Sequence, residues 1–217
     1  AYGVIACPSG HQFYEIRWMH NPHVARDYPR YWFRTKGAEP RKYSSWLADS
    51  AWAVHQVHPN EAFILDLFPD LLKNFQGWEE RHWVKEMNMF WQTGHDDGME
   101  FNINSRQTKD ILRGDRAFRP TFNSYMWADA TALSKIASLK KDRKLEKKYR
   151  AIASNLKRQI QEKLWDPKRN FFFPMSSREE KDKEGNVVKA HTLTYQSGKF
   201  AGNPHGRELH GYVPWAF

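Results

Sequence analysis

The sequence contains a single cysteine, Cys7, among 217 residues. One thiol excludes an internal disulfide and a cysteine-based zinc site, because each needs more than one cysteine. No apolar run approaches the ~20 residues that a membrane-spanning helix requires, and no signal peptide is recognisable. We therefore expect no membrane partner, and both cytoplasmic and secreted locations stay open.

Patterns for nucleotide and nucleic-acid binding are also missing. The sequence has neither a GxGxxG motif nor a P-loop. The net charge is +9, but much of the positive charge lies in segments 140–150 and 176–189, which we interpret as a solvated helix face and a surface loop. No basic stretch alternates with stacking aromatic residues, so we expect no nucleic-acid partner.

Aromatic residues are abundant, with ten tryptophans, nine tyrosines and fourteen phenylalanines. Large aromatic side chains offer flat apolar faces that match the apolar faces of sugar rings. The same residues are also common in ordinary hydrophobic cores. The composition is therefore compatible with a carbohydrate-binding protein and equally with an aromatic-rich core.

Helical spacing of apolar residues predicts a mainly helical chain. The expected helices lie over 43–58, 58–83, 119–139 and 144–167. Shorter segments are a strand or helix start over 13–19, a helix that follows Pro22 over 21–33, and an extended piece over 170–175.

Capping residues and prolines set the expected helix boundaries. The capping candidates are Ser44 or Ser45, Asn60, and Asn123 or Ser124. Pro29 is expected to interrupt its helix, Pro69 to kink or divide one, and Pro167 to end the last.

The expected fold class is all-α, with antiparallel helix pairs whose connections alternate between short and long. No strand alternates with the helices in a βαβ order. We interpret residues 1–217 as one catalytic domain, part of a helical toroid with long loops on one rim.

The segment FWQTGHDDGMEF, residues 90–101, carries three carboxylates within five residues: Asp96, Asp97 and Glu100. Turn chemistry explains a solvated loop of this composition, because Asp and Gly are common in turns. A metal loop would add His95 to the three acids, but the spacing fits neither HExxH nor the calcium loop, so we expect no metal. The third interpretation is the acid end of a carbohydrate-cleaving site.

Three segments resemble one family in order: residues 44–79, residues 90–103 around TGHDDGMEF, and RPTFNSYMWADATALSKIA at 119–137. With the tail GRELHGYVPWAF, they are similar to the (α/α)6-barrel glycoside hydrolases of the mannosylglycerate-hydrolase-like group, related to trehalases and processing glucosidases (six-hairpin glycosidases). The resemblance implies a toroid of twelve helices. That is more than this chain holds, so we expect a fragment of a longer protein.

The resemblance implies a catalytic acid in an S-G-x-D-type loop. One register selects Asp96, and another, on DGME, selects Glu100, which we favour with Asp97 and Asp96 behind it. We expect Trp91, Met99 and Phe101 to wall Glu100 and, with Asp97, to raise its pKa. The family's second carboxylate is not assigned in this chain.

Further residues are candidates for sugar binding. They are Arg17, Trp18, Trp91, Asn102, Asn123, Tyr125, Arg207, Glu208 and Trp215. Alternatives stay open for several of them: Asn123 as a helix cap, Trp18 as a core residue, and Arg207 with Glu208 as a plain salt bridge.

The sequence thus predicts a glycosidase without a cofactor that acts by carboxylate general acid/base catalysis. Its expected partner is an oligosaccharide or small glycoside, and the oligomeric state stays open. The alternative is a non-catalytic helical protein of the same fold that binds carbohydrate or serves as a scaffold.

Overall fold

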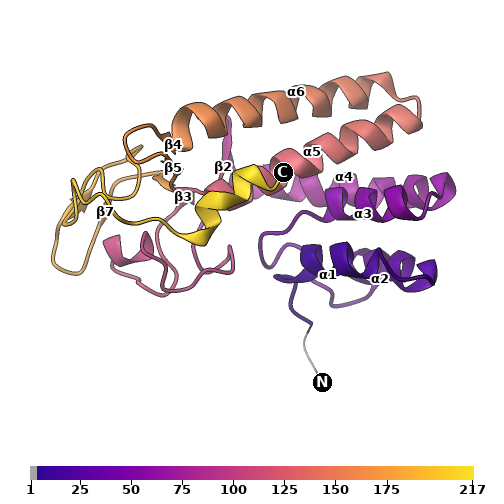
Figure 1. The fold of residues 1–217 in the computed structure, drawn as a ribbon, viewed down its shortest axis with the longest axis horizontal. Helices are drawn as coiled ribbons and strands as arrows, with labels where there is room; N and C mark the ends of the chain where they lie inside the picture. Colours follow the sequence, from indigo (N-terminus) through magenta and orange to yellow (C-terminus); the bar gives the residue numbers. More distant parts are fainter. Residues whose placement is uncertain (1–3) are drawn as a thin grey trace. The chain divides into compact units, whose positions relative to one another are not determined.

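The computed structural model describes residues 4–217. They form two compact units that interleave along the chain (Figure 1). Among the described residues, unit 1 comprises 4–81 and 125–154, and unit 2 comprises 82–124 and 155–217. About half of the described residues are helical and little of the chain is sheet, which is compatible with a helical glycosidase fold. The single domain over 1–217 stays a prediction.

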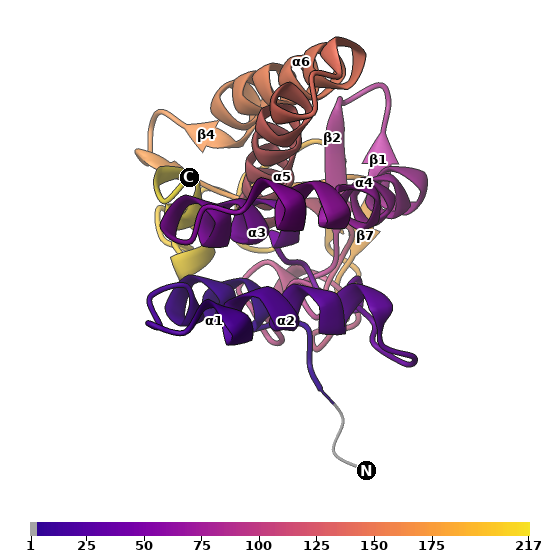
Figure 2. The same ribbon diagram turned by 90° about the vertical axis from the view of Figure 1, so that its right-hand side faces the viewer.

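Six α-helices run through the described residues, and most of their length lies in unit 1. They are α1 (Ser9–Ile16), α2 (Pro22–Arg34), α3 (Leu47–Val57), α4 (Glu61–His82), α5 (Pro120–Leu139) and α6 (Arg143–Gln159). Short turns join α1 to α2, α3 to α4 and α5 to α6, so the helices form three consecutive hairpins (Figures 1 and 2). The helix pairs predicted from the sequence are therefore present in unit 1. Closure of six hairpins into a toroid stays a prediction.

The core of unit 1 begins where α1 packs against α2 and α3. Its first cluster is formed by the buried side chains of Ala6, Phe13, Ala25, Trp32, Leu47 and Val54. Apolar burial of this kind is the main source of helix stability in proteins. The sequence left segment 13–19 open between a strand and the start of a helix. In the structure its first four residues are the last turn of α1.

The interruption expected at Pro29 does not occur, because α2 continues through it, and α4 is not divided at Pro69. The alternative of a kink at Pro69 stays a prediction. A proline inside a helix removes one hydrogen bond and costs about 3 kcal/mol. In α4 the residues on both sides of the proline, Leu67 and Leu71, are buried. Packing on both sides of the proline thus offsets the lost bond and keeps one helix.

Asn60 caps α4 as predicted, since its Oδ1 accepts a hydrogen bond from Phe63 N at 2.8 Å. The prediction of Ser44 or Ser45 as the cap of α3 is wrong. The α3 amides of Ala48 and Asp49 instead donate to Oδ1 of Asp129, at 2.8 and 3.0 Å. The carboxylate of Asp129 in α5 therefore caps the N-terminus of α3 in place of a neighbouring side chain.

Replacing Asp129 by alanine should lower the free energy of unfolding by about 1–3 kcal/mol, because one buried and one partly buried amide of α3 lose their acceptor. Asp129→Asn keeps an acceptor and should lose less. Urea unfolding of the full-length protein measures both changes. Asp27→Ala is the control, because its partner Arg30 is on the surface. Equal midpoints for Asp129→Ala and Asp27→Ala would contradict the capping role.

The start of α5 also differs from the prediction. The helix begins at Pro120, whose missing N–H costs nothing in a first turn. Neither Asn123 nor Ser124 is therefore its cap. Asn123 accepts from Phe90 N and donates to Phe90 O, both at 2.9 Å, so its amide pairs with the neighbouring strand.

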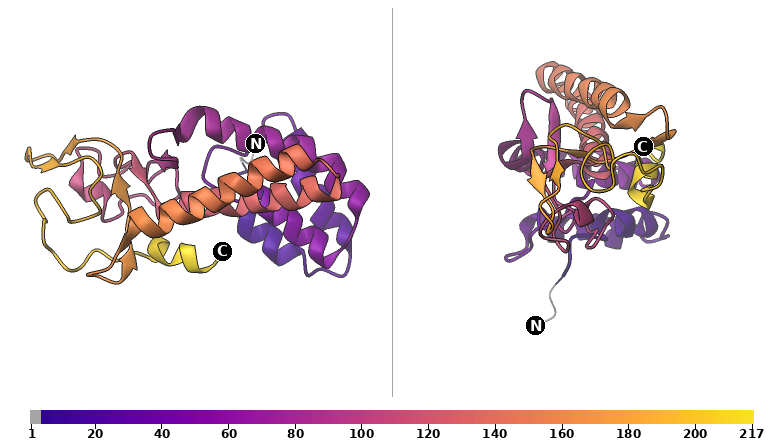
Figure 3. Two further views of the ribbon diagram at one scale, coloured as in Figure 1. Left: turned by 90° about the horizontal axis from the view of Figure 1, so that it is seen from above. Right: turned by 90° about the vertical axis from the view of Figure 1, so that its left-hand side faces the viewer.

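The last long helix closely matches its predicted span. α6 passes into a single π-helical segment, η2 (Ile160–Leu164), and the helical run ends before Pro167 as predicted (Figure 3). In unit 1, Ser134 of α5 donates to Glu146 O of α6 at 3.1 Å. No helix of the described residues is both long enough and apolar enough to cross a membrane.

Unit 2 carries short antiparallel strands. A four-stranded sheet has the order β1 (Trp83–Val84), β2 (Met89–Gln92), β3 (Ala117–Phe118), β6 (Met175–Ser176). Two strand pairs join β4 (Trp165–Asp166) to β5 (Phe171–Phe172) and β7 (Glu180–Lys181) to β8 (Val187–Val188). The prediction of an extended piece over 170–175 is confirmed, whereas the other strands are too short to show a period of two in the sequence.

Candidate functional site

The acid loop, residues 93–104, joins β2 to the 3-10 helix η1 (Ser105–Gln107) in unit 2. Its first turn is closed by backbone bonds from Asp97 N to Thr93 O, Gly98 N to His95 O and Met99 N to Gly94 O. Gly98 has φ +74°, a conformation that favours glycine. Turn chemistry therefore does shape this segment, as one interpretation of the sequence expected.

Beyond Gly98 the loop doubles back on itself. Phe101 has φ +58°, which is uncommon for a bulky side chain and costs on the order of 1–3 kcal/mol. Asn102 lies close to Gly94, where any side chain would clash with the Asn102 amide. Glu100 is therefore displayed on a tight bend between two packed segments.

Asp97 is the buried member of the acid trio. Its Oδ2 accepts a hydrogen bond from Arg119 Nε at 2.7 Å, and both side chains are fully buried. Thr121 also donates to the same oxygen. A carboxylate enclosed by a guanidinium and a hydroxyl anchors the loop and has no open path to a ligand within unit 2.

Asp96 and Glu100 are more accessible and share one neighbour. Asp96 is paired with Arg113 at 3.1 Å and with His95 Nδ1 at 2.8 Å. Glu100 has His95 Nε2 at 3.9 Å, and its side chain is 40% exposed against 30% for Asp96. Among residues 4–217, no lysine or arginine pairs with Glu100, so it is the most exposed and least paired carboxylate of the three.

The expected aromatic wall around Glu100 is incomplete in unit 2. Phe101 is exposed, whereas Trp91 is half-buried. The Trp91 ring faces the Arg116 guanidinium at 4.3 Å and the His82 ring at 4.6 Å. The sequence also suggested that the negative charge of Asp97 would repel that of Glu100. In the structure Arg119 pairs with Asp97 and compensates this charge.

The C-terminal candidates Arg207, Glu208 and Trp215 lie in unit 2 and contact different partners. Arg207 donates to Arg169 O at 2.5 Å and does not form an ion pair with Glu208. Glu208 instead accepts from the acid loop, at Ile103 N, with a distance of 2.6 Å. Trp215, at the end of the 3-10 helix η3 (Leu209–Trp215), packs its half-exposed ring on Phe172 at 5.0 Å.

Three other candidates lie in unit 1. The Arg17 guanidinium stacks over the exposed Trp18 ring at 4.9 Å, so Trp18 is not a core residue. Tyr125 is buried, and its ring lies 4.4 Å from that of Trp46. The remaining candidates, Asn102 and Asn123, satisfy backbone groups of unit 2.

A second set of ionisable groups is buried in unit 1. The Tyr14 hydroxyl donates to Asp49, and burial raises the pKa of both side chains. Burial also raises the pKa of Asp129 well above its ordinary value, although two α3 amides partly offset this. In the part of the chain that the structure describes, no cluster of three or more His, Cys, Asp or Glu side chains could hold a metal ion.

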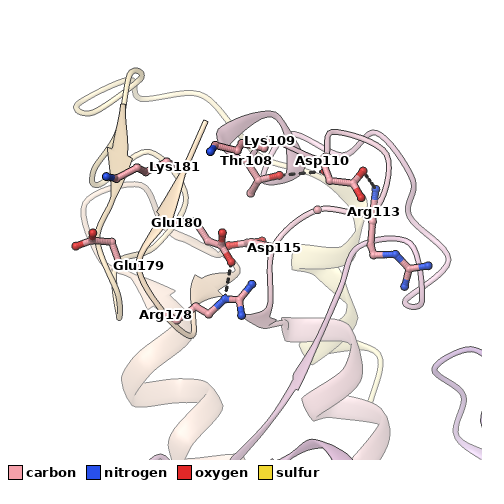
Figure 4. Close-up of a pocket in the computed structure, with 10 residues that line it drawn as sticks. Thr108, Lys109, Asp110, Arg113, Asp115, Arg178, Glu179, Glu180 and Lys181 are labelled. Carbon is pink, nitrogen blue, oxygen red and sulfur yellow. Dashed lines mark hydrogen bonds and ion pairs between the residues drawn. The ribbon is translucent and has the colours of Figure 1, made fainter. Parts of the chain in front are cut away.

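A cavity of about 470 Å³ in unit 2 is lined by residues of the segments 108–115 and 178–181 (Figure 4). Its lining contains equal numbers of positive and negative side chains: Lys109, Asp110, Arg113, Asp115, Arg178, Glu179, Glu180 and Lys181. Arg178 pairs with Glu180 at 2.6 Å, and Arg113 links the cavity to Asp96. No aromatic side chain lines it, so it lacks the stacking surface typical of sugar sites.

Asp115 at this cavity should make stability depend on pH. Burial raises its pKa to about 6, against the partial effects of Ser176 and Arg119. Because the folded state holds the proton more tightly, the resulting stability is complete below about pH 4 and is lost as pH rises through 6.

The expected loss between pH 4.5 and 7.5 is on the order of 2 kcal/mol, and Asp115→Asn should remove it. Urea unfolding at the two pH values measures the difference between the proteins. Parallel pH curves for the wild-type protein and Asp115→Asn would rule out this role of Asp115.

Sequence reasoning did not single out Arg119, Asp115 or His210. The position of Arg119 could have indicated a need for a partner. It directly precedes Pro120, so its positive charge lies at the positive, N-terminal end of the α5 dipole, where a positive charge is unfavourable. Such a placement calls for a carboxylate partner, which the structure supplies in Asp97. Asp115 and His210 left no comparable signal, since their burial depends on residues far away in the sequence.

The family model described as "Mannosylglycerate hydrolase MGH1-like glycoside hydrolase domain" matches residues 1–217. The chain belongs to this family, as the sequence resemblance predicted. Membership supports glycosidase activity in general terms.

One solved structure, named as a sialidase, is similar over the full length of this chain. The two are 31% identical with a TM-score of 0.80. The match covers 100% of this chain and 18% of that one, so the chain spans under a fifth of the length of that relative. The comparison with curated proteins found no match.

Proposed function

We propose that this chain belongs to a glycosidase that cleaves a glycosidic bond with Glu100 as the general acid. The observation that carries the proposal is the contrast within the acid loop. Asp97 pairs with buried Arg119 and Asp96 pairs with Arg113, whereas Glu100 is exposed and pairs with no lysine or arginine among the described residues. Glycoside cleavage needs such a carboxylic acid to protonate the leaving oxygen.

Among the described residues, His95 is the ionisable side chain that lies within ion-pair distance of the proposed acid. Its Nδ1 lies 2.8 Å from Asp96, and its Nε2 lies 3.9 Å from Glu100. A hydrogen bond at one ring nitrogen sets the role of the other, so Asp96 orients the imidazole toward Glu100. In this proposal Asp96 and Asp97 support the acid and do not replace it.

The reaction also needs a second carboxylate across the sugar, and its separation from the acid decides between retention and inversion. That group is unassigned in this chain. We further propose that the three hairpins of α1–α6 contribute to a toroid completed by other parts of the protein. The sugar ligand would then be an oligosaccharide or a small glycoside.

Hydrolysis of aryl glycosides by the full-length protein tests the proposal. The panel contains aryl α-glucosides, α-mannosides and α-arabinofuranosides, with trehalose and mannosylglycerate as natural disaccharide-type substrates. An aryl sialoside is added because the similar solved structure is named as a sialidase. Release of the aglycone from at least one substrate supports glycosidase function. Sugar binding in calorimetry without release from any of them would favour the non-catalytic alternative.

A further inference from the structure

The segment that carries Glu100 depends on a bend that needs support. Phe101 follows Glu100 directly and has φ +58°. A non-glycine residue keeps this conformation only when its surroundings hold it there. The identity of those surroundings decides the direction of the Glu100 side chain.

Some of the support comes from within the loop. Asn102 Nδ2 donates to Met99 O at 2.6 Å, and Ser105 N donates to Asn102 Oδ1 at 2.9 Å. These bonds tie the loop to itself. They leave the amide of Ile103, between Asn102 and Asn104, to find an acceptor elsewhere.

That acceptor is Glu208, which is 105 positions further along the chain. Ile103 N donates to Glu208 Oε1 at 2.6 Å, and the amide of Asn104 also interacts with this carboxylate. Hydrogen bonds to an ionised acceptor are shorter and roughly twice as strong as neutral ones. The contact therefore fastens the C-terminal side of the bend to the start of η3.

We propose that Glu208 is a positioning residue that fixes residues 103 and 104 and thereby holds Glu100 in the direction needed for proton transfer. This inference rests on the proposed function of Glu100. Within unit 2 the acid is then held from both sides. Asp97 anchors the loop three residues before Glu100, and Ile103 anchors it three residues after.

The surroundings of Glu208 fit an anchoring role. Its side chain is 15% exposed, and its Oε2 lies 3.7 Å from Nε2 of the buried His210. Burial lowers the pKa of His210 well below its ordinary value, so this imidazole is neutral near pH 7 and supplies no positive charge. Burial raises the pKa of Glu208, and the amides of Ile103 and Asn104 together with the positive charges of Arg119 and Arg106 partly offset this. Arg119 thus acts on both anchors, since it also pairs with Asp97.

Two other roles for Glu208 fit the structure less well. A sugar clamp formed with Arg207 would need both side chains on one face, yet Arg207 donates to Arg169 O. A direct catalytic role would need an accessible oxygen. Oε1 is already bonded to Ile103, and Oε2 is buried.

The test compares Glu208→Ala, Glu208→Gln and the control Glu184→Ala in the full-length protein. Glu184 is an exposed carboxylate paired with Lys199 at the surface of the same unit. Hydrogen exchange of peptides spanning 99–107 reports on the loop without any substrate. For Glu208→Ala we expect exchange about tenfold faster or more, because the Ile103 amide loses its acceptor. Glu208→Gln keeps an acceptor and should fall in between, and Glu184→Ala should match the wild-type protein.

Activity is measured on phenyl and dinitrophenyl glycosides of the sugar that the wild-type protein cleaves. Dinitrophenolate leaves without protonation, whereas phenolate needs the acid. Glu208→Ala should lower kcat on the phenyl glycoside by about 10- to 100-fold, because a misplacement of about 1 Å has an effect of that size. The dinitrophenyl rate and both KM values should change by less than about threefold.

Unchanged exchange in Glu208→Ala, or equal losses on both substrates, would overturn the positioning role. If Glu208→Ala does not fold, the same criteria apply to Glu208→Gln, which keeps the size of the side chain. Faster exchange in a protein whose wild-type form cleaves no glycoside would overturn the proposed function and leave the anchoring contact supported.

Discussion

Glu100→Gln should reduce hydrolysis of phenyl glycosides by the full-length protein by about 10²–10⁴-fold, the usual contribution of a general acid. Glutamine keeps the size and hydrogen-bonding reach of the side chain but has no proton to deliver to the leaving oxygen. Because Glu100 is exposed and pairs with no lysine or arginine in the described part of the chain, its replacement should leave stability almost unchanged. Steady-state kinetics and a urea unfolding curve measure the two quantities.

The control is Glu184→Gln, which removes a surface carboxylate of the same unit. It should retain wild-type rates on both phenyl and dinitrophenyl glycosides. The dinitrophenyl rate of Glu100→Gln should fall far less than its phenyl rate. Full activity of Glu100→Gln would show that Glu100 is not the acid, and a large loss in Asp96→Asn alone would favour the register that selects Asp96.

Arg119→Met should lower the free energy of unfolding by about 3–5 kcal/mol, because it leaves the carboxylate of Asp97 buried without a counter-charge. Arg119 and Asp97 are both fully buried, and the 2.7 Å bond between them is short and charge-assisted. Methionine fills much of the same volume, so the loss should come from the unpaired charge more than from a cavity. Urea unfolding followed by tryptophan fluorescence measures it.

A double replacement separates charge from packing. Arg119→Met combined with Asp97→Asn removes both charges and should recover a large part of the lost stability, as coupled neighbours do. Arg113→Met is the matched surface control. It breaks the Asp96 ion pair at an exposed position and should change stability by less than about 1 kcal/mol. Similar losses in Arg113→Met and Arg119→Met would contradict the role given to the buried pair.

The sequence predicted the helices well where the evidence was local. The apolar stripe over 144–167 matches a helical run that ends at Leu164, and Asn60 caps α4 because its acceptor serves an amide three residues away. The same reasoning failed at Pro29, which does not interrupt α2, and at the start of α3. In those places buried contacts from elsewhere in the chain outweigh the local preference.

In the candidate site, too, only the features that depend on residues close in the sequence were predictable. The acid loop was recognisable because its carboxylates and glycines lie within a few residues and resemble a family motif. The difference between Asp97 and Glu100 was not predictable. It depends on Arg119, which lies 22 positions from Asp97 in the sequence. Spacing alone does not show which carboxylate a distant guanidinium will neutralise.

The interleaved composition of unit 1 has a consequence for synthesis on the ribosome. Within this chain, residues 1–81 are synthesised before Asp129. The amides at the start of α3 therefore lack their acceptor until Asp129, which is 81 positions after Ala48, has been made. Loop closure over such a distance must precede the contact, so α3 can gain its final stability only after the acid loop has been made. The nascent chain therefore exposes an unfinished helical layer while the segment that carries Glu100 is being translated.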